Sequence, residues 1–195
     1  MKNNLLLIIL FLLSINAISQ NKKFSIDINY PLSLSNGEFD KISGIIDGSL
    51  KYRFKETDLL EFGISYTFDL LKGKISPFVN EPDLNKNFIF HHLDVFSELN
   101  LNSTDRFHPF FGLGYTMLNY DYEYFYGNNE FTEIRTKKEN DSGINFNLGL
   151  KYDISDMFFV QTYFHYIRTF RKSVISDKNI GINNNQLKFG LGYRF

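Results

Sequence analysis

The chain has 195 residues, with 21 Lys and Arg against 22 Asp and Glu, so its formal charge of −1 offers no basic excess for binding nucleic acid. It contains no cysteine, which excludes a disulfide framework and lipid attachment at a cysteine. Hydrophobic residues make up 43% of the chain, yet the mean hydropathy is −0.23 and no long apolar run follows the first residues, which excludes a bundle of membrane-spanning helices.

The first residues have the organisation of a secretory signal peptide. Lys2 supplies a positive start, residues 5–13 are apolar, and residues 17–19 (Ala-Ile-Ser) offer the small side chains that a signal peptidase reads. The apolar run is too short to span a bilayer as a helix, which needs about 20 residues. We therefore predict a signal peptide at residues 1–19 and one domain at residues 20–195.

Beyond residue 20, apolar and polar side chains alternate, as they do in strands with one apolar and one polar face. The last nine residues alternate at every step and end on an aromatic side chain. The eight predicted strands are 23–34, 42–54, 59–70, 88–101, 107–120, 143–152, 157–170 and 187–195. An Asn36-Gly37 turn signal follows the first strand.

The connections between these segments alternate in length. Short turns are predicted at 55–58, 102–106 and 153–156, and longer loops at 72–87, 121–141 and 171–184. This pattern predicts an all-β fold, an eight-stranded antiparallel up-and-down transmembrane β-barrel with both termini on the periplasmic side.

The interior of an eight-stranded barrel is just wide enough for side chains to fill. The inward positions carry acids and bases in nearly equal number, and buried charges need partners, so we predict an ion-pair network that plugs the lumen. Its members are Asp27, Asp47, Lys51, Arg53, Glu61, Asp94, Glu98, Lys151, Lys188 and Arg194. The predicted turn at 55–58 places Arg53 across from Glu61. A small or gated pore for solutes is the alternative.

Two segments carry a family resemblance, residues 109–115 (PFFGLGY) and residues 190–195 (GLGYRF). With them, the chain resembles the small eight-stranded outer-membrane barrels, the OmpA-like and OmpX-like group, and above all the outer-membrane β-barrel domain proteins of Bacteroidota. The resemblance implies the outer membrane of a Gram-negative bacterium, with lipid and lipopolysaccharide as neighbours. It also implies that the barrel-insertion machinery recognises the last strand, through Leu191, Tyr193 and Phe195.

Some barrels of this size modify lipid A, which requires a nucleophile or base near the outer leaflet. The chain has four histidines, and none is followed two positions later by serine, as a His-x-Ser arrangement would require. His92 and Asp94 share the inward face of one strand, which fits a neighbouring pair inside the lumen better than a catalytic dyad. The histidine spacing gives no metal motif. We therefore expect no enzyme, no metal and no cofactor.

Residues 120–135 read as a hairpin that continues past the membrane and turns at residues 127–129 (Gly-Asn-Asn). The predicted contacts for an extracellular protein or glycan are Tyr122, Tyr124, Tyr126, Phe131 and Arg135. Such a surface would give the protein a structural or ligand-binding role. The alternative is that these tyrosines form the aromatic girdle at the membrane surface. Nothing in the sequence indicates oligomerisation, so we expect a monomer.

Overall fold

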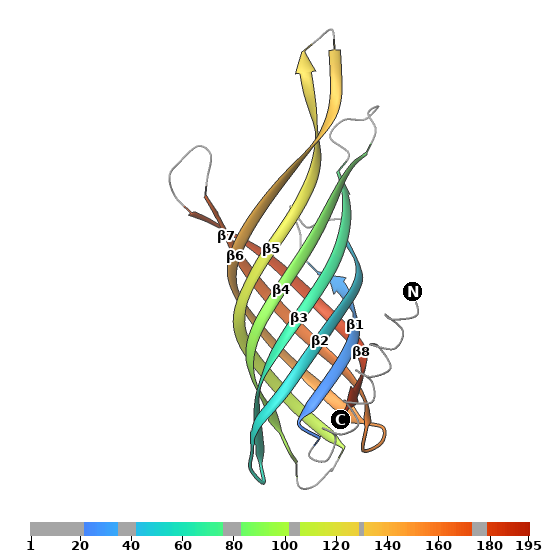
Figure 1. Cartoon of the computed structure of the whole chain (residues 1–195), viewed down its shortest axis with the longest axis vertical. Coiled ribbons are helices and arrows are strands. Elements are labelled where there is room, and N and C mark those ends of the chain that lie inside the picture. Colours follow the sequence, from blue (N-terminus) through green and yellow to red (C-terminus); the bar gives the residue numbers. More distant parts are fainter. Residues whose placement is uncertain (1–21, 35–41, 76–82, 102–105, 129–130, 173–178) are drawn as a thin grey trace, which may run out of the picture.

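The computed structural model describes residues 22–34, 42–75, 83–101, 106–128, 131–172 and 179–195. Within these ranges the chain forms eight antiparallel strands, each paired with its neighbours in sequence, and β1 also pairs with β8 to close a barrel (Figure 1). The strands are β1 (Phe24–Ser33), β2 (Ile42–Glu56), β3 (Leu60–Ile75), β4 (Leu84–Leu99), β5 (Phe107–Asn128), β6 (Phe131–Asp153), β7 (Phe158–Lys172) and β8 (Asn179–Arg194). The predicted all-β, eight-stranded up-and-down fold is confirmed.

Two predicted features, the signal peptide at 1–19 and the Asn36-Gly37 turn, lie outside the described residues. In the described ranges, no helix has the length and apolarity needed to cross a membrane.

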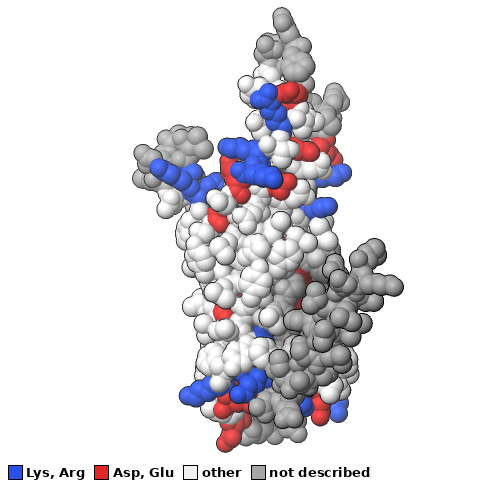
Figure 2. Space-filling view, in the orientation of Figure 1, with Lys and Arg blue, Asp and Glu red and all other residues white. Residues whose placement is uncertain are grey.

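The alternation of the sequence separates the two faces of the wall. On β1, Ile26 and Ile28 are 46% and 62% exposed, whereas Ser25 and Asp27 are 0% and 3% exposed. Successive side chains of a strand point to opposite faces, so the apolar set covers the outside and the polar set fills the lumen. On the face drawn in Figure 2, a band almost free of charge lies between charged groups gathered at the two ends.

The two ends of the barrel differ. The C-terminus lies at one end, called here the terminal end (Figure 1). From the opposite end, the hairpin end, β5 and β6 project beyond the other strands as a two-stranded ribbon. These two strands have 22 and 23 residues, the longest in the barrel.

The predicted connection at 121–141 is therefore mostly paired, as the hairpin predicted at 120–135 requires, and β6 also continues through residues 136–142. Tyr122 pairs with Lys137, and pairing continues to Asn128 and Phe131. A ribbon outside a membrane has water on both faces, so it needs backbone pairing but no strict alternation, and the alternation pattern does not reveal its length.

The predicted hairpin is present. Gly127 and Asn128 pair with Thr132 and Phe131, and residues 129–130 between them lie outside the described part. The predicted loops at 72–87 and 171–184 are also shorter than expected, because β3, β4, β7 and β8 extend into them.

The register explains how aromatic rings fit inside a narrow barrel. Phe96 on β4 pairs with Gly112 on β5. The Phe96 ring, however, lies over Gly63 on the other neighbouring strand, where an added Cβ would overlap it. Glycine on one strand thus makes room for a ring on the next.

Candidate functional site: the filled lumen and the projecting hairpin

The lumen near the terminal end holds a cluster of charges around one carboxylate. Glu98 is 1% exposed and accepts hydrogen bonds from Arg53 at 3.2 Å, from Arg194 at 3.4 Å, and from Lys151. Arg53 also lies 2.7 Å from Glu61. These five residues, the terminal cluster, come from β2, β3, β4, β6 and β8, so they connect the barrel wall across its interior.

The middle of the lumen is built around an ammonium group. Lys188 Nζ, 0% exposed, donates to Asp47 Oδ2 at 2.5 Å and to Asp69 Oδ2 at 2.6 Å. A second pair, Lys51 and Asp27, lies beside them at 3.0 Å. These charges lie on β1, β2, β3 and β8. The pairing of β1 with β8 closes the barrel and brings the inward positions of these strands together.

Neutral side chains connect these pairs. Gln161 donates to both Asp27 and Asn29, at 2.8 and 2.7 Å, and accepts from Lys51 at 3.1 Å. Asn29 in turn donates to Asp47 at 2.6 Å. Asp94, which sequence reasoning placed in the network, is 3% exposed, and its Oδ1 has no hydrogen-bond partner among the described residues.

Sequence reasoning missed an apolar layer that crosses the lumen toward the hairpin end. Its members are buried, inward-facing and in mutual contact, and they are Ile42, Leu71, Phe88, Phe90, Leu118, Tyr120 and Ile167. Most of them lie an even number of positions from an inward polar residue on the same strand, as Leu118 does from Thr116. This spacing is the sequence pattern that would have placed them inside the lumen.

His92 lies just below this layer, where its ring stacks on Phe90 at 5.8 Å between centroids. Its Nδ1 is 2.7 Å from Thr116 Oγ1 and its Nε2 is 3.4 Å from Asp69 Oδ2. The polar contacts of His92 are therefore with residues of β3 and β5, and its ring also lies 4.6 Å, between centroids, from that of His165 on β7.

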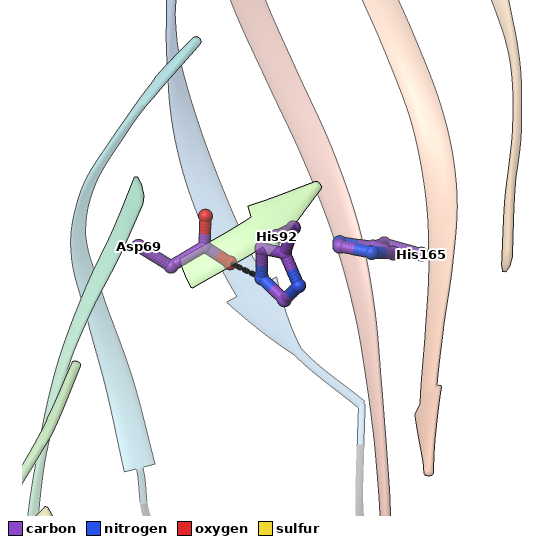
Figure 3. A group of neighbouring side chains, drawn as sticks. All are labelled: Asp69, His92 and His165. Carbon is purple, nitrogen blue, oxygen red and sulfur yellow. Dashed lines mark hydrogen bonds and ion pairs between the residues drawn. The ribbon is translucent and has the colours of Figure 1, made fainter. Parts of the chain in front are cut away.

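The structure also brings together residues that spacing along the chain did not connect. Asp69, His92 and His165 place one potential ligand atom each within 4.8 Å of the others (Figure 3). Their side chains come from β3, β4 and β7. The prediction of no metal site rested on local histidine spacing, which does not detect ligands on three separate strands.

The hairpin ribbon, residues 119–128 with 131–140, begins where the unbroken run of outward apolar residues ends, and within it Ile134 is exposed at an outward position. Met117 and Ile144, on paired strands, are 52% and 51% exposed on the outer face, and beyond them the outward positions carry Asn119 and Asn140. The ribbon therefore stands beyond the band that faces lipid.

One face of the ribbon carries a ladder of tyrosines. The rings of Tyr120 and Tyr122 stack with their centroids 6.1 Å apart, and the rings of Tyr122 and Tyr124 have centroids 6.3 Å apart. Tyr126, 50% exposed, lies 3.6 Å from the Arg135 guanidinium, which also pairs with Glu133. The side chain of Phe131, also predicted here, lies outside the described part.

The base of the ribbon is fixed by Glu139. It accepts hydrogen bonds from Tyr120 at 2.6 Å and Tyr122 at 3.4 Å, and pairs with Lys137 at 2.6 Å. The hydrogen bond from Lys137, followed by that from Tyr120, lowers the pKa of Glu139 below its ordinary value. Burial, together with the hydrogen bond to Glu139, raises the pKa of Tyr120.

Of the predicted insertion residues, Leu191 and Tyr193 lie on the outer face of β8, and Phe195 directly follows its last residue, Arg194. Leu191 is 64% exposed. The Phe195 ring is only 7% exposed, because it stacks with Phe24 at 6.0 Å and with Tyr193 at 6.1 Å. Backbone hydrogen bonds between Phe195 and Phe24 hold the end of the chain against β1.

The profile of a family described as "Outer membrane protein beta-barrel domain" matches residues 5–195. A comparison with curated protein sequences found no match. Among solved structures, the fold is similar to that of Neisserial surface protein A, with a TM-score of 0.55 and 11% identity over 89% of this chain and 97% of that chain. It is similar to that of OprG from Pseudomonas aeruginosa, with a TM-score of 0.55 and 12% identity over 88% of this chain and 95% of that chain. It is also similar to that of Ail of Yersinia pestis, with a TM-score of 0.51 and 14% identity over 88% of this chain and 97% of that chain.

Proposed function

Since this chain belongs to the outer membrane protein beta-barrel domain family and is an outer-membrane β-barrel protein, we propose that its barrel is a closed anchor and that the hairpin ribbon binds an extracellular protein or glycan. The observation that carries this proposal is the continued pairing of β5 and β6, to Asn128 and Phe131, beyond the lipid-facing band. A paired ribbon presents side chains in fixed positions, which lowers the entropic cost of binding.

The proposed orientation places the termini in the periplasm and the ribbon outside the cell. Short turns join the strands at the terminal end, and the longest strands and connections lie at the other end. Outer-membrane barrels have short periplasmic turns and longer extracellular segments.

Two features support a closed lumen. The ion-paired clusters fill its lower and middle parts, where a cavity lined by Lys51, Phe96 and His165 has a volume of about 20 Å³, room for about one water molecule. The apolar layer lies above them, and apolar constrictions exclude water and ions.

The proposal includes no catalysis. His92 is 0% exposed, and its ring stacks on Phe90 of the apolar layer. A lipid A acyl chain outside the wall could not reach this histidine.

The face that carries the tyrosine ladder is suited to recognition. Tyrosine and arginine are the residues that contribute most often to binding energy at protein interfaces. Tyr126 and Arg135 lie in contact at the exposed part of this face.

The test is a shortened ribbon. Residues 123–136 are replaced by Asn-Gly, which joins the paired residues Tyr122 and Lys137. Tyr122 and Lys137 face each other in the same way as Asn128 and Phe131, which enclose two residues. A two-residue turn therefore fits the twist of the strands at the new position as well. Whole cells with either chain are assayed on immobilised extracellular-matrix proteins and on protein-free glycans.

We expect the full chain to bind one of the two surfaces and the shortened chain to lose that binding at equal surface expression. Equal binding by both chains contradicts the proposal. As a control, Glu56→Gln changes an exposed residue near the terminal end and leaves binding unchanged.

A further inference from the structure

Asp69, His92 and His165 form a compact donor set inside the lumen. Their potential ligand atoms lie within 4.8 Å of one another, and the residues are 0%, 0% and 1% exposed. In Figure 3 the His92 ring lies between the Asp69 carboxylate and the His165 ring. The donors therefore converge from β3, β4 and β7.

Several of these donor atoms have no hydrogen-bond partner. Among the described residues, neither ring nitrogen of His165 has one, and neither does Asp69 Oδ1. Buried polar atoms of this kind are costly and are normally satisfied by the protein, by water or by an ion. In a neutral imidazole one ring nitrogen is a donor and the other an acceptor, so one nitrogen of His165 and Asp69 Oδ1 offer buried lone pairs without a hydrogen-bond partner.

His92 is held in the orientation that a metal ligand requires. Its Nδ1 lies 2.7 Å from Thr116 Oγ1, and Asn145 donates to the same hydroxyl oxygen at 3.0 Å. With Nδ1–H donated to Thr116, the lone pair of Nε2 points toward Asp69. Metal-binding histidines commonly have their second ring nitrogen fixed in this way.

The local charge also favours a cation. Four carboxylates, those of Asp27, Asp47, Asp69 and Asp94, outnumber the two ammonium groups of Lys51 and Lys188 in this part of the lumen. Lys188 binds Asp69 through Oδ2, the oxygen that also faces His92 Nε2 at 3.4 Å, and leaves Oδ1 free of hydrogen bonds.

We propose that Asp69, His92 and His165 bind one divalent transition-metal ion of the zinc class. Two imidazole nitrogens and one carboxylate oxygen form an established zinc ligand set, with bonds of about 2.0–2.2 Å. In a tetrahedral site two ligand atoms lie about 3.4 Å apart, so the widest separation here has to close by about 1.4 Å, which small movements of two side chains can supply.

His165 also lines a cavity of about 20 Å³ with room for about one water molecule, and neither Asp69 nor His92 lines that cavity. An ion bound by the three side chains connects β7 with β3 and β4 across the lumen and takes one of the unpaired ring nitrogens of His165. The site thus adds a structural cross-link to the filled barrel, independently of the hairpin ribbon.

The test uses the full folded chain without a histidine tag, in detergent micelles, after treatment with a chelator. Co²⁺ serves as the probe because its visible absorption reports four-coordinate nitrogen and oxygen ligands, and Zn²⁺ as the competitor. We expect one Co²⁺ per chain, displaced by Zn²⁺. His165→Gln binds at least 100-fold more weakly, as expected for the loss of a direct ligand.

The matched control is His91→Gln, because His91 lies on the outer face, where it contacts Tyr66, and its removal leaves Co²⁺ binding unchanged. Heat-modified mobility on gels verifies that each variant is folded. If His165→Gln does not fold, zinc X-ray absorption of the unmodified chain decides, with two imidazole ligands expected. Absence of stoichiometric binding, or zinc without imidazole ligands, overturns the proposal.

Discussion

Arg53 Nε lies 2.7 Å from Glu61 Oε2, although the backbone register places Arg53 opposite Gly63. A register shift between Arg53 and Lys55 displaces the two strands, so the ion pair forms diagonally across the hairpin. Diagonal neighbours on paired strands remain within reach of long side chains. The same guanidinium also binds Glu98, which makes this carboxylate the centre of the terminal cluster.

Replacing Glu98 by glutamine should destabilise the barrel strongly. The change removes the negative charge that Arg53, Lys151 and Arg194 share, and leaves Lys151, 1% exposed, without a paired carboxylate. Breaking a buried ion pair costs about 3–5 kcal/mol. Urea unfolding of the folded chain, followed by circular dichroism because the chain has no Trp, measures the effect.

The control for this prediction is Glu133→Gln. Glu133 pairs with Arg135 on the exposed ribbon, where such a pair contributes about 0–1 kcal/mol. A Glu98→Gln barrel as stable as the control shows that the terminal cluster does not hold the barrel together.

Gly63→Ala should destabilise the barrel by about 1–3 kcal/mol, because the new Cβ overlaps the Phe96 ring and the Tyr52 carbonyl oxygen. Gly48→Ala is the matched control on the neighbouring strand, since nothing lies within 4 Å of a Cβ there. The two unfolding free energies are compared under the same conditions. Equal stability of the two variants would disprove the close fit of Phe96 over Gly63.

The base of the hairpin ribbon should loosen in acid. The pKa of Glu139 is lowered by hydrogen bonds from Lys137 and Tyr120, so its contribution to stability is present above its ordinary pKa of 4.5 and is lost as the pH falls through the lower folded value. We expect constant hydrogen-exchange protection factors for ribbon amides between about pH 5 and 8, and lower ones in more acidic solution.

Glu139→Gln removes the titrating group, so in this variant the protection factors should not change with acidification. The same acid dependence in wild type and variant would assign the effect to another group.

The alternation of side chains was sufficient to predict the strands and most inward charges, because lipid outside and a narrow lumen inside impose opposite preferences on successive residues. The sequence also predicted the hairpin at 120–135, but the alternation did not show that β6 is continuous from this hairpin to Asp153. It also missed the apolar layer, because inward Leu118 and Ile167 interrupt an otherwise polar face.

The meeting of Asp69, His92 and His165 depends on how three distant strands are staggered around the barrel. Local spacing along the chain contains no such information. Likewise, Phe96 pairs with Gly112 in the register, but the direction of its ring toward Gly63 depends on the packing inside the lumen.

The central claim is that the barrel is a filled anchor, so that function lies in the ribbon outside it. Single-channel recording of the purified, folded chain in planar bilayers tests this most directly. The ion-paired clusters and the apolar layer from Ile42 to Ile167 predict no steady conductance at either polarity. Reproducible, long-lived open channels from the unmodified chain would contradict the account and identify the protein as a pore.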